Sequence, residues 1–408
     1  MPKRPVAAVL LGVAIAATAA VGMAAPAHAA GTRWLEIRFP GPGGRRDSAV
    51  LGLPSWYTPR DDPRLPLVVS PHSRGLTPWQ EARRWGDLPD RFRLVVVVPG
   101  LHGRVIARRS WAWPPDIAET SALPRILGRR IPYLRYDPNR VYAAGDSMGG
   151  QETLMLVARR PDLFAAAVAA DPVTNFVRRW YEFPLSEESW HEQAAATREV
   201  GATPRRARWL YVRRSPLFFA RTFAFSGVPL QLWWNPRDTV VIREGSAQSG
   251  AFYRAVKRLN PRAQVFARLD HSMHGWAFKY DHGLPAMIRF LLAHRMHGPP
   301  AGGFAYSSWE PRATVWGWHV RALDPGKSLW SIWDVTPAGF DTEARIPLLV
   351  RPPERAAVSV PAGRHRVTLD SVSGPVGVVT RLVAGVPGLA KPGRRQVPVR
   401  SGLGRDRS

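Results

Sequence analysis

The sequence contains no cysteine among its 408 residues. Disulfide bonds, thiol nucleophiles and cysteine-ligated zinc or iron–sulfur centres are therefore excluded. Lysine is also scarce, because only five of the 57 basic residues are lysines and the arginines are scattered through every segment. No basic helix, RNA-binding strand motif or zinc knuckle accompanies the net charge of +26. The composition therefore argues against a nucleic-acid partner, although contact with an anionic cell surface is compatible with it.

A long apolar run occurs only at the N-terminus. Lys3 and Arg4 precede an alanine-rich stretch from Val6 to about Ala25, and the small-x-small motif Ala27-His28-Ala29 follows it. This pattern predicts a secretory signal peptide over residues 1–30, with a membrane anchor as the alternative. We expect export to the extracellular space or the exterior of the cell envelope, and no stable membrane insertion after cleavage.

The rest of the chain divides into segments of different character. From Trp34 to about Ala293, short β-rich runs alternate with helical stretches, which is typical of an α/β domain with a mostly parallel sheet flanked by helices. We expect the chain to be organised as an α/β domain over 31–297 with an aromatic, helical insertion over 173–226, a small all-β domain over 304–386 and a basic disordered tail over 387–408.

Individual elements follow from apolar runs and helical spacing. The expected strands of the α/β domain are Trp34–Phe39, Ser48–Pro54, Leu65–Ser70, Leu94–Val98, Arg140–Ala144, Leu163–Ala170, Pro229–Trp234 and Val265–Leu269. The expected helices outside the insertion are Trp79–Trp85, Ile117–Leu134, Gly149–Arg159, Ser246–Leu259 and Leu284–His294.

One pentapeptide carries a specific chemical signal. Gly145-Asp146-Ser147-Met148-Gly149 fits the Gly-x-Ser-x-Gly nucleophile elbow, in which a serine sits on a strained turn between a strand and a helix. The motif alone is weak, but here a predicted strand precedes it and a predicted helix follows it. We therefore expect Ser147 to be a nucleophile, and an idle serine in a tight glycine turn is the alternative.

A serine hydroxyl needs a base, and the base needs an acid that fixes its tautomer. When the serine lies on such an elbow, the acid and the histidine follow it along the chain in that order. Asp238 lies in the loop after the strand Pro229–Trp234 and is the candidate acid. A solvated loop carboxylate, or a partner of Arg237, is the alternative. Asp171, after the preceding strand, is a reserve acid or a turn residue.

Two histidines compete for the role of base. His271 and His274 both follow the strand Val265–Leu269, and His271 is favoured because it comes closer to the strand end. A third possibility is a metal site made of Asp270, His271, His274 and His282. The segment lacks the helical spacing of zinc-binding motifs, so we expect no metal and no other cofactor.

Acyl transfer also requires donors that stabilise an oxyanion. The amide of Met148, directly after the nucleophile, is one candidate, and the amide of Ser73, in the loop after the third strand, is the other. His72 in that loop is expected to shape it. Trp111 and Trp113 are candidates for a substrate pocket, with core packing as an equal alternative.

Four stretches together resemble secreted α/β-hydrolases near the prolyl oligopeptidase-like and poly(3-hydroxybutyrate) depolymerase-like esterase groups. They lie between about Leu65 and Ala293 and read Pro66-Leu67-Val68-Val69-Ser70-Pro71-His72, Tyr136-Asp137-Pro138-Asn139-Arg140-Val141-Tyr142, Gly145-Asp146-Ser147-Met148-Gly149-Gly150 and Arg214-Ser215-Pro216. The resemblance implies a cofactor-free triad of Ser147, Asp238 and His271. Since relatives of this kind cleave esters or peptides, it does not choose between these substrates.

The sequence therefore predicts a secreted serine hydrolase that cleaves small or polymeric carboxylic esters through an acyl-enzyme intermediate. A prolyl oligopeptidase-like peptidase is one alternative. A non-catalytic binding protein is the other, because five tryptophans of the β domain could stack on sugar rings or a polymer surface. Trp316 and Trp318 would then share one face of a strand, although core packing is the commoner use of such residues. The five are Trp309, Trp316, Trp318, Trp330 and Trp333.

Overall fold

The computed structural model describes most of the chain: residues 31–41, 46–58, 64–100, 110–186, 189–275, 283–324, 328–369 and 380–384. The expected signal peptide and the basic tail lie outside these residues. Within the described part of the chain, no helix is both long and apolar enough to cross a membrane.

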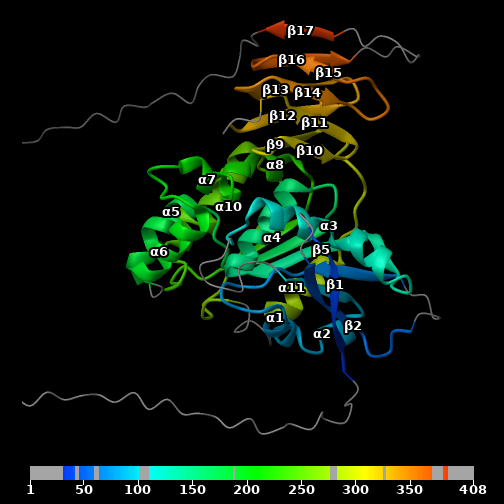
Figure 1. The fold of residues 1–408 in the computed structure, drawn as a ribbon, viewed down its shortest axis with the longest axis vertical. Coiled ribbons are helices and arrows are strands. Elements are labelled where there is room, and N and C mark those ends of the chain that lie inside the picture. Colours follow the sequence, from blue (N-terminus) through cyan, green and yellow to red (C-terminus); the bar gives the residue numbers. More distant parts are fainter. Residues whose placement is uncertain are drawn as a thin grey trace, which may run out of the picture.

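Among the described residues, an eight-stranded sheet forms the centre of the first domain (Figure 1). Its strands lie side by side in the order β1-β2-β4-β3-β5-β6-β7-β8. The first two strands are antiparallel to their neighbours and all later pairs are parallel. The strands are β1 (Arg33–Pro40), β2 (Arg46–Leu53), β3 (Leu65–Val69), β4 (Val95–Pro99), β5 (Tyr136–Asp146), β6 (Ala166–Ala170), β7 (Leu230–Trp234) and β8 (Val265–Leu269).

Helices cover both faces of this sheet, which explains why the central strands are continuous aliphatic runs. Every residue of β3 (LPLVV) and β4 (VVVVP) is buried. On one face lie α1 (Pro78–Trp85), α2 (Leu88–Phe92) and α11 (Gly283–Leu292); on the other lie α3 (Pro114–Arg130), α4 (Ser147–Arg159) and α10 (Ser249–Leu259), with the short α9 (Glu244–Ala247) before it. The predicted α/β class is confirmed.

Two strand starts differ from the prediction by three or more residues. β5 begins at Tyr136 rather than Arg140, because Tyr136 already pairs with Leu65 of β3 before a register shift. β6 begins at Ala166 rather than Leu163, because Leu163 still belongs to the turn that ends α4.

Between β6 and β7 the chain forms a group of short helices that projects from one side of the sheet (Figure 1). Their aromatic side chains form a separate apolar cluster that includes Phe176, Tyr211, Trp111 and Met148, the residue after Ser147. This segment is therefore anchored on the elbow. Its elements are α5 (Phe176–Glu182), η3 (Phe183–Leu185), α6 (Ser189–Val200), α7 (Arg208–Val212), η4 (Pro216–Phe219) and α8 (Ala220–Phe225).

The C-terminal part is antiparallel β structure, as predicted. One sheet has the order β10-β11-β14-β15 and the other the order β17-β16-β13-β12-β9. The strands are β9 (Phe304–Ser308), β10 (Arg312–Val315), β11 (Trp318–Ala322), β12 (Trp330–Thr336), β13 (Gly339–Ala344), β14 (Leu348–Arg351), β15 (Val358–Val360), β16 (Gly363–Leu369) and β17 (Thr380–Ala384).

The tryptophans of this domain mostly fill its core. Trp318, Trp330 and Trp333 are buried, while Trp309 and Trp316 are partly buried. Trp316 does not share a strand face with Trp318. It occupies the tight turn between β10 and β11 with φ 43°, followed by Gly317 with φ 80°, so the alternative of an exposed row of indoles is wrong and the favoured core packing is confirmed for Trp318 and Trp330.

Candidate active site

The nucleophile elbow forms where the sequence predicts it. β5 ends at Asp146, α4 begins at Ser147, and Ser147 has a left-handed φ of 53°, a conformation that a non-glycine residue adopts at a cost. A methyl group on Gly145 would lie 2.5 Å from the Gly149 carbonyl oxygen, and one on Gly149 would lie 2.3 Å from the Pro71 carbonyl oxygen. Both glycines are therefore required for the backbones to approach so closely.

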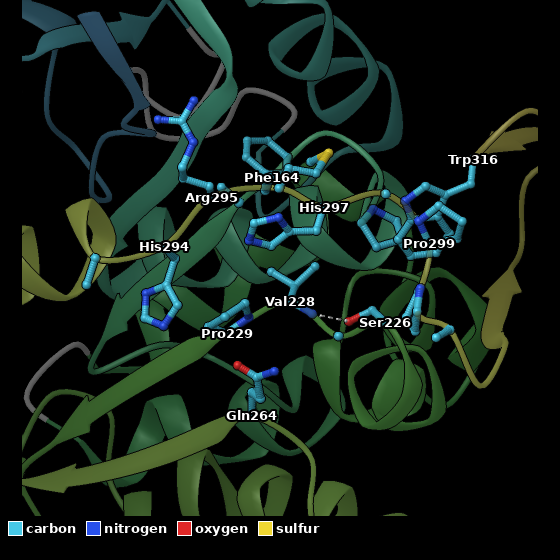
Figure 2. Close-up of a pocket in the computed structure, with 18 residues that line it drawn as sticks. Phe164, Ser226, Val228, Pro229, Gln264, His294, Arg295, His297, Pro299 and Trp316 are labelled. Atoms are coloured by element: carbon cyan, nitrogen blue, oxygen red, sulfur yellow. Dashed lines mark hydrogen bonds between the residues drawn. The ribbon is translucent and has the colours of Figure 1, made fainter.

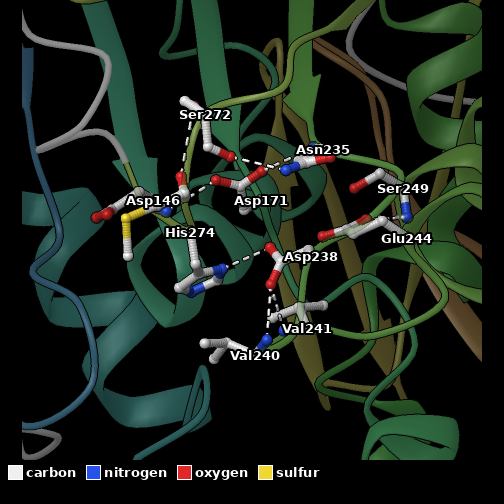
Figure 3. A network of polar contacts seen from close by, with 12 residues as sticks. Asp146, Asp171, Asn235, Asp238, Val240, Val241, Glu244, Ser249, Ser272 and His274 are labelled. Carbon is white, nitrogen blue, oxygen red and sulfur yellow. Dashed lines mark hydrogen bonds and ion pairs between the residues drawn. The ribbon is translucent and has the colours of Figure 1, made fainter. Parts of the chain in front are cut away.

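A pair made of a buried carboxylate and a partly buried imidazole lies at the same edge of the sheet (Figure 3). Asp238 follows β7, and its Oδ2 lies 2.6 Å from His274 Nδ1. Its Oδ1 accepts hydrogen bonds from the amides of Val240 (2.8 Å) and Val241 (2.9 Å). These contacts fix the Asp238 carboxylate, and the carboxylate in turn fixes the imidazole with Nδ1 as the protonated nitrogen.

The structure brings His274, and not the favoured His271, to Asp238. After β8, Asp270 Oδ1 accepts the amide of Ser272 at 3.0 Å, which turns the chain. His271 lies on the outside of this turn and is exposed, with no hydrogen bond or ion pair of its ring among the described residues. His274 lies where the chain comes back to the carboxyl end of β7.

The metal set that the sequence offers as an alternative does not assemble among the described residues. His282 lies outside the described residues, and Asp270 and His271 do not join His274. The described residues instead place ligand atoms of Asp171, Asp238 and His274 within 4.8 Å of one another. These atoms are already used in hydrogen bonds to each other or to backbone amides, so the donor set does not fit a metal ion.

The groups around His274 shift the pKa of its imidazole. Burial opposes the charged form of His274, but the hydrogen bond and charge of Asp238, together with the charges of Asp171 and Asp146, outweigh it and raise the pKa of His274. The other ring nitrogen, Nε2, is buried and has no hydrogen-bond partner among the described residues. It is therefore available to accept a proton.

A third carboxyl group lies beside this pair. Glu244 is buried, and its Oε2 accepts the amide of Ser249 at 2.9 Å. Burial, and then the charges of Asp171 and Asp238, raise the pKa of Glu244 well above its usual range. Burial and these neighbouring charges therefore disfavour the ionised form of Glu244.

Both predicted oxyanion donors lie at the elbow. Met148 is buried in the first turn of α4, where amides lack intrahelical partners, and the Asp146 side chain does not cap the helix. The Ser73 hydroxyl donates to the Asp146 carboxylate, which holds the loop after β3 against the elbow. His72 is buried, and its Nδ1 donates to the Ser73 carbonyl at 3.0 Å, as expected of a residue that shapes the loop.

Arg74, the next residue in this loop, has a role that the sequence did not reveal. Its guanidinium binds both carboxylate oxygens of Glu199, at 2.8 and 2.9 Å, and also binds Glu192. It lies 4.8 Å from the ring centre of Trp111, which is itself buried and stacked on Phe176. Arg74 therefore ties the loop to α6, and Trp111 is a core residue. The partners are 118 and 125 residues apart, so no local pattern signals them.

A separate hollow lies elsewhere in this domain (Figure 2). It has a volume of about 540 Å³ and is lined by Phe164, Val228, Pro229, Gln264 and His294, among others. Pro229 and Gln264 directly precede β7 and β8, and Phe164 lies two residues before β6, whereas Ser147, Asp238 and His274 follow strands. The hollow is thus at the opposite edge of the sheet from the elbow.

The sheet order, the elbow and the buried Asp–His pair together define an α/β-hydrolase domain. Residues 133–294 match the prolyl oligopeptidase family. Over 88 residues, 20% of this chain, the sequence is 33% identical to a poly(3-hydroxybutyrate) depolymerase of Ralstonia pickettii, of which it covers 18%. The expected resemblance is confirmed.

Two solved structures are among those to which the chain is similar. A puromycin hydrolase aligns with a TM-score of 0.50 at 19% identity, covering 68% of this chain and 42% of that one. The acylaminoacyl peptidase of Pyrococcus horikoshii aligns with a TM-score of 0.49 at 18% identity, covering 64% and 40%. The chain spans less than half the length of these relatives. The matches to the prolyl oligopeptidase family and to the depolymerase support a serine hydrolase.

Proposed function

We propose that the protein is a serine hydrolase that cleaves carboxylic esters through an acyl-enzyme intermediate. The observation that carries this proposal is the 2.6 Å contact between Asp238 and His274 at the sheet edge that also bears the Ser147 elbow. Matches to the prolyl oligopeptidase family and to a depolymerase of a polyester support the same class.

The mechanism follows from these positions. Ser147 Oγ attacks the ester carbonyl carbon while its proton passes to His274 Nε2, and the amides of Met148 and Ser73 stabilise the oxyanion. When the tetrahedral intermediate collapses, the carbon–oxygen bond to the alcohol breaks and His274 returns the proton to the departing alcohol. A water molecule, deprotonated by His274, then attacks the acyl carbon. The bond between this carbon and Ser147 Oγ breaks, His274 returns the proton to Oγ, and the acid leaves. Asp238 orients the imidazole throughout.

Esters are favoured over peptides by the charge pattern of α6. A peptidase that recognises a free amino terminus would need an unpaired acid near the nucleophile. Glu192 and Glu199 face the loop after β3, but both bind the guanidinium of Arg74. A prolyl oligopeptidase-like peptidase therefore remains the second candidate, supported by the family match. The binding-protein alternative loses its basis because Trp318, Trp330 and Trp333 are buried.

Export is part of the proposal. The N-terminal apolar run and its small-x-small motif support a secreted protein, which would meet small or polymeric esters outside the cell. Its net charge of +26 supports contact with anionic cell surfaces.

Ser147→Ala tests the proposed chemistry. We expect the wild-type protein to hydrolyse p-nitrophenyl esters and to be labelled by a fluorophosphonate, and the variant to do neither. His274→Ala should lower kcat by roughly 1000-fold or more, whereas the matched variant His271→Ala should stay within about threefold of wild type. Equal activity of Ser147→Ala and wild type would contradict the mechanism. Faster cleavage of aminoacyl amides than of short or long esters would favour the peptidase.

A further inference from the structure

Asp171 occupies an unusual position between the two loops of the site. It directly follows β6, is fully buried, and has a left-handed φ of 43°. Its amide donates to the Trp233 carbonyl at 2.7 Å, which ties it to β7. A buried acid in a strained conformation needs compensating contacts, and its carboxylate supplies them.

The two oxygens of Asp171 hold two different loops. Oδ1 accepts the amide of Asn235 at 3.2 Å, where the Asp238 loop begins. Oδ2 accepts the amide of Gly275 at 2.8 Å, directly after His274. Neither bond is to the imidazole. One carboxylate thus sets the separation between the loop of the acid and the loop of the base (Figure 3).

A second bridge joins the same loops. The Asn235 side-chain nitrogen donates to the Ser272 carbonyl at 2.8 Å. Asn235 is therefore fixed to Asp171 through its backbone and to the His274 loop through its side chain.

Gly275 connects this arrangement to the nucleophile. It has φ 85°, and a methyl group there would lie 2.7 Å from Asp146 Oδ2. Gly275 is thus confined between Asp171 on one side and Asp146, which precedes Ser147, on the other. Any shift of Gly275 would move His274 relative to the elbow.

We propose that Asp171 is a positioning residue, which holds the His274 loop at the correct distance from Asp238 and Ser147 through its two backbone hydrogen bonds and takes no part in proton transfer. This inference rests on the proposed hydrolase function. It replaces the role of reserve acid, because both carboxylate oxygens face amides.

Asp171→Asn tests the inference, because an amide of the same shape offers one acceptor instead of two. We expect kcat for p-nitrophenyl acetate and the rate of fluorophosphonate labelling to fall together by roughly 10- to 100-fold, with KM within about twofold, since a displaced base slows acylation without weakening binding. Asp90→Asn is the matched control. Asp90 also accepts a backbone amide, that of Ser55, at 3.0 and 3.1 Å, but lies on α2. It should leave kcat within about twofold of wild type.

A double-mutant comparison separates positioning from general loss of stability. Asn235→Ala breaks the second bridge and should lower kcat with unchanged KM, and its effect should not add to that of Asp171→Asn because both act on one loop pair. If Asp171→Asn fails to fold, Asn235→Ala alone carries the test. The inference is overturned by a kcat within twofold of wild type in the folded variants, by equal losses in Asp90→Asn, or by strict additivity. A wild-type protein that fluorophosphonate does not label contradicts the proposed function instead.

Discussion

At the scale of single residues, the proposed site depends on which groups are charged. Asp171 and Asp238 are buried near Glu244, and the charges of the two aspartates raise the pKa of His274. Burial alone would lower the pKa of the imidazole. A raised pKa of His274 therefore indicates that these carboxylates are ionised and lie close to it. The same balance determines the pH at which the base becomes neutral.

The rate of ester hydrolysis should depend on pH through the protonation of His274. Because the pKa of His274 is raised above 6.5, kcat/KM for ester hydrolysis should rise with pH along an acid limb centred above 6.5. The protonated ring also stabilises the fold: this contribution is fully present below pH 6.5 and is lost as pH rises through the folded pKa. Initial rates between about pH 5 and 9 measure the limb.

Asp238→Asn provides the control for this profile. It removes the largest favourable influence on the charged ring and leaves burial, so the acid limb should move to lower pH while kcat falls. An acid limb at or below 6.5 in the wild-type protein would contradict the assignment of His274 as the base.

At the scale of elements, the elbow and the loop after β3 fit together through Gly149. A Cβ at this position would meet the Pro71 carbonyl at 2.3 Å and the His72 backbone at 3.1 Å, and a backbone cannot move aside as a flexible side chain can. The loop that carries Ser73 can therefore pack this closely on α4 only because residue 149 has no side chain.

Gly149→Ala should push the loop after β3 away from α4. We expect it to lower the free energy of unfolding by roughly 1–3 kcal/mol and to slow fluorophosphonate labelling, because the Ser73 amide is displaced. Gly128→Ala in α3 is the matched control, since a methyl group there meets only Tyr136 at 3.9 Å. It should be neutral or stabilise by up to about 1 kcal/mol. Urea titration and labelling rates measure both effects, and a variant as stable as wild type would refute the argument.

The sequence predicts most of the sheet and part of the site. β3 and β4 are recognisable because strands buried on both faces are continuous aliphatic runs. Ser147 and Asp238 are predictable because the first directly follows a strand and the second lies in the loop after one. The choice of His274 over His271 was not predictable, because it depends on the turn that Asp270 makes with Ser272.

Other features of the site depend on contacts between distant segments. Arg74 meets Glu199 from 125 residues away, and Asp171 meets Gly275 from 104 residues away. Trp316 and Trp318 have the spacing of strand neighbours, but the first of them occupies a tight turn. Spacing alone does not distinguish a strand from a two-residue hairpin loop.

At the scale of the whole molecule, the two domains are joined by a partly buried ionic contact. Glu310 of the β domain lies 2.8 Å from Arg159 of α4 and 2.6 Å from Arg213 of the insertion. Burial disfavours its charge, but the two arginines overcome this and lower the pKa of Glu310. The contact thus fastens the β domain to the helix that starts at the nucleophile.

Glu310→Gln should loosen this junction. Two partly buried arginines would lose their carboxylate, so we expect a lower Tm and faster proteolysis in the linker at 298–303. In the wild-type protein, this contribution is present above about pH 4.5 and is lost as pH falls through the lowered pKa, a dependence that the variant should lack. Glu343→Gln, which breaks an exposed pair with Arg364, is the control and should change Tm little. Equal effects of the two variants would show that Glu310 does not hold the junction.

The left-handed backbone at Ser147 has one more consequence. Glycine accepts that geometry freely, so Ser147→Gly should relieve local strain of about 1–3 kcal/mol while it removes the attacking oxygen. Catalytic activity and folding stability therefore place opposite demands on position 147. A more stable variant without the nucleophile would keep an ester bound and uncleaved, so that a crystal structure of the complex would identify the ester.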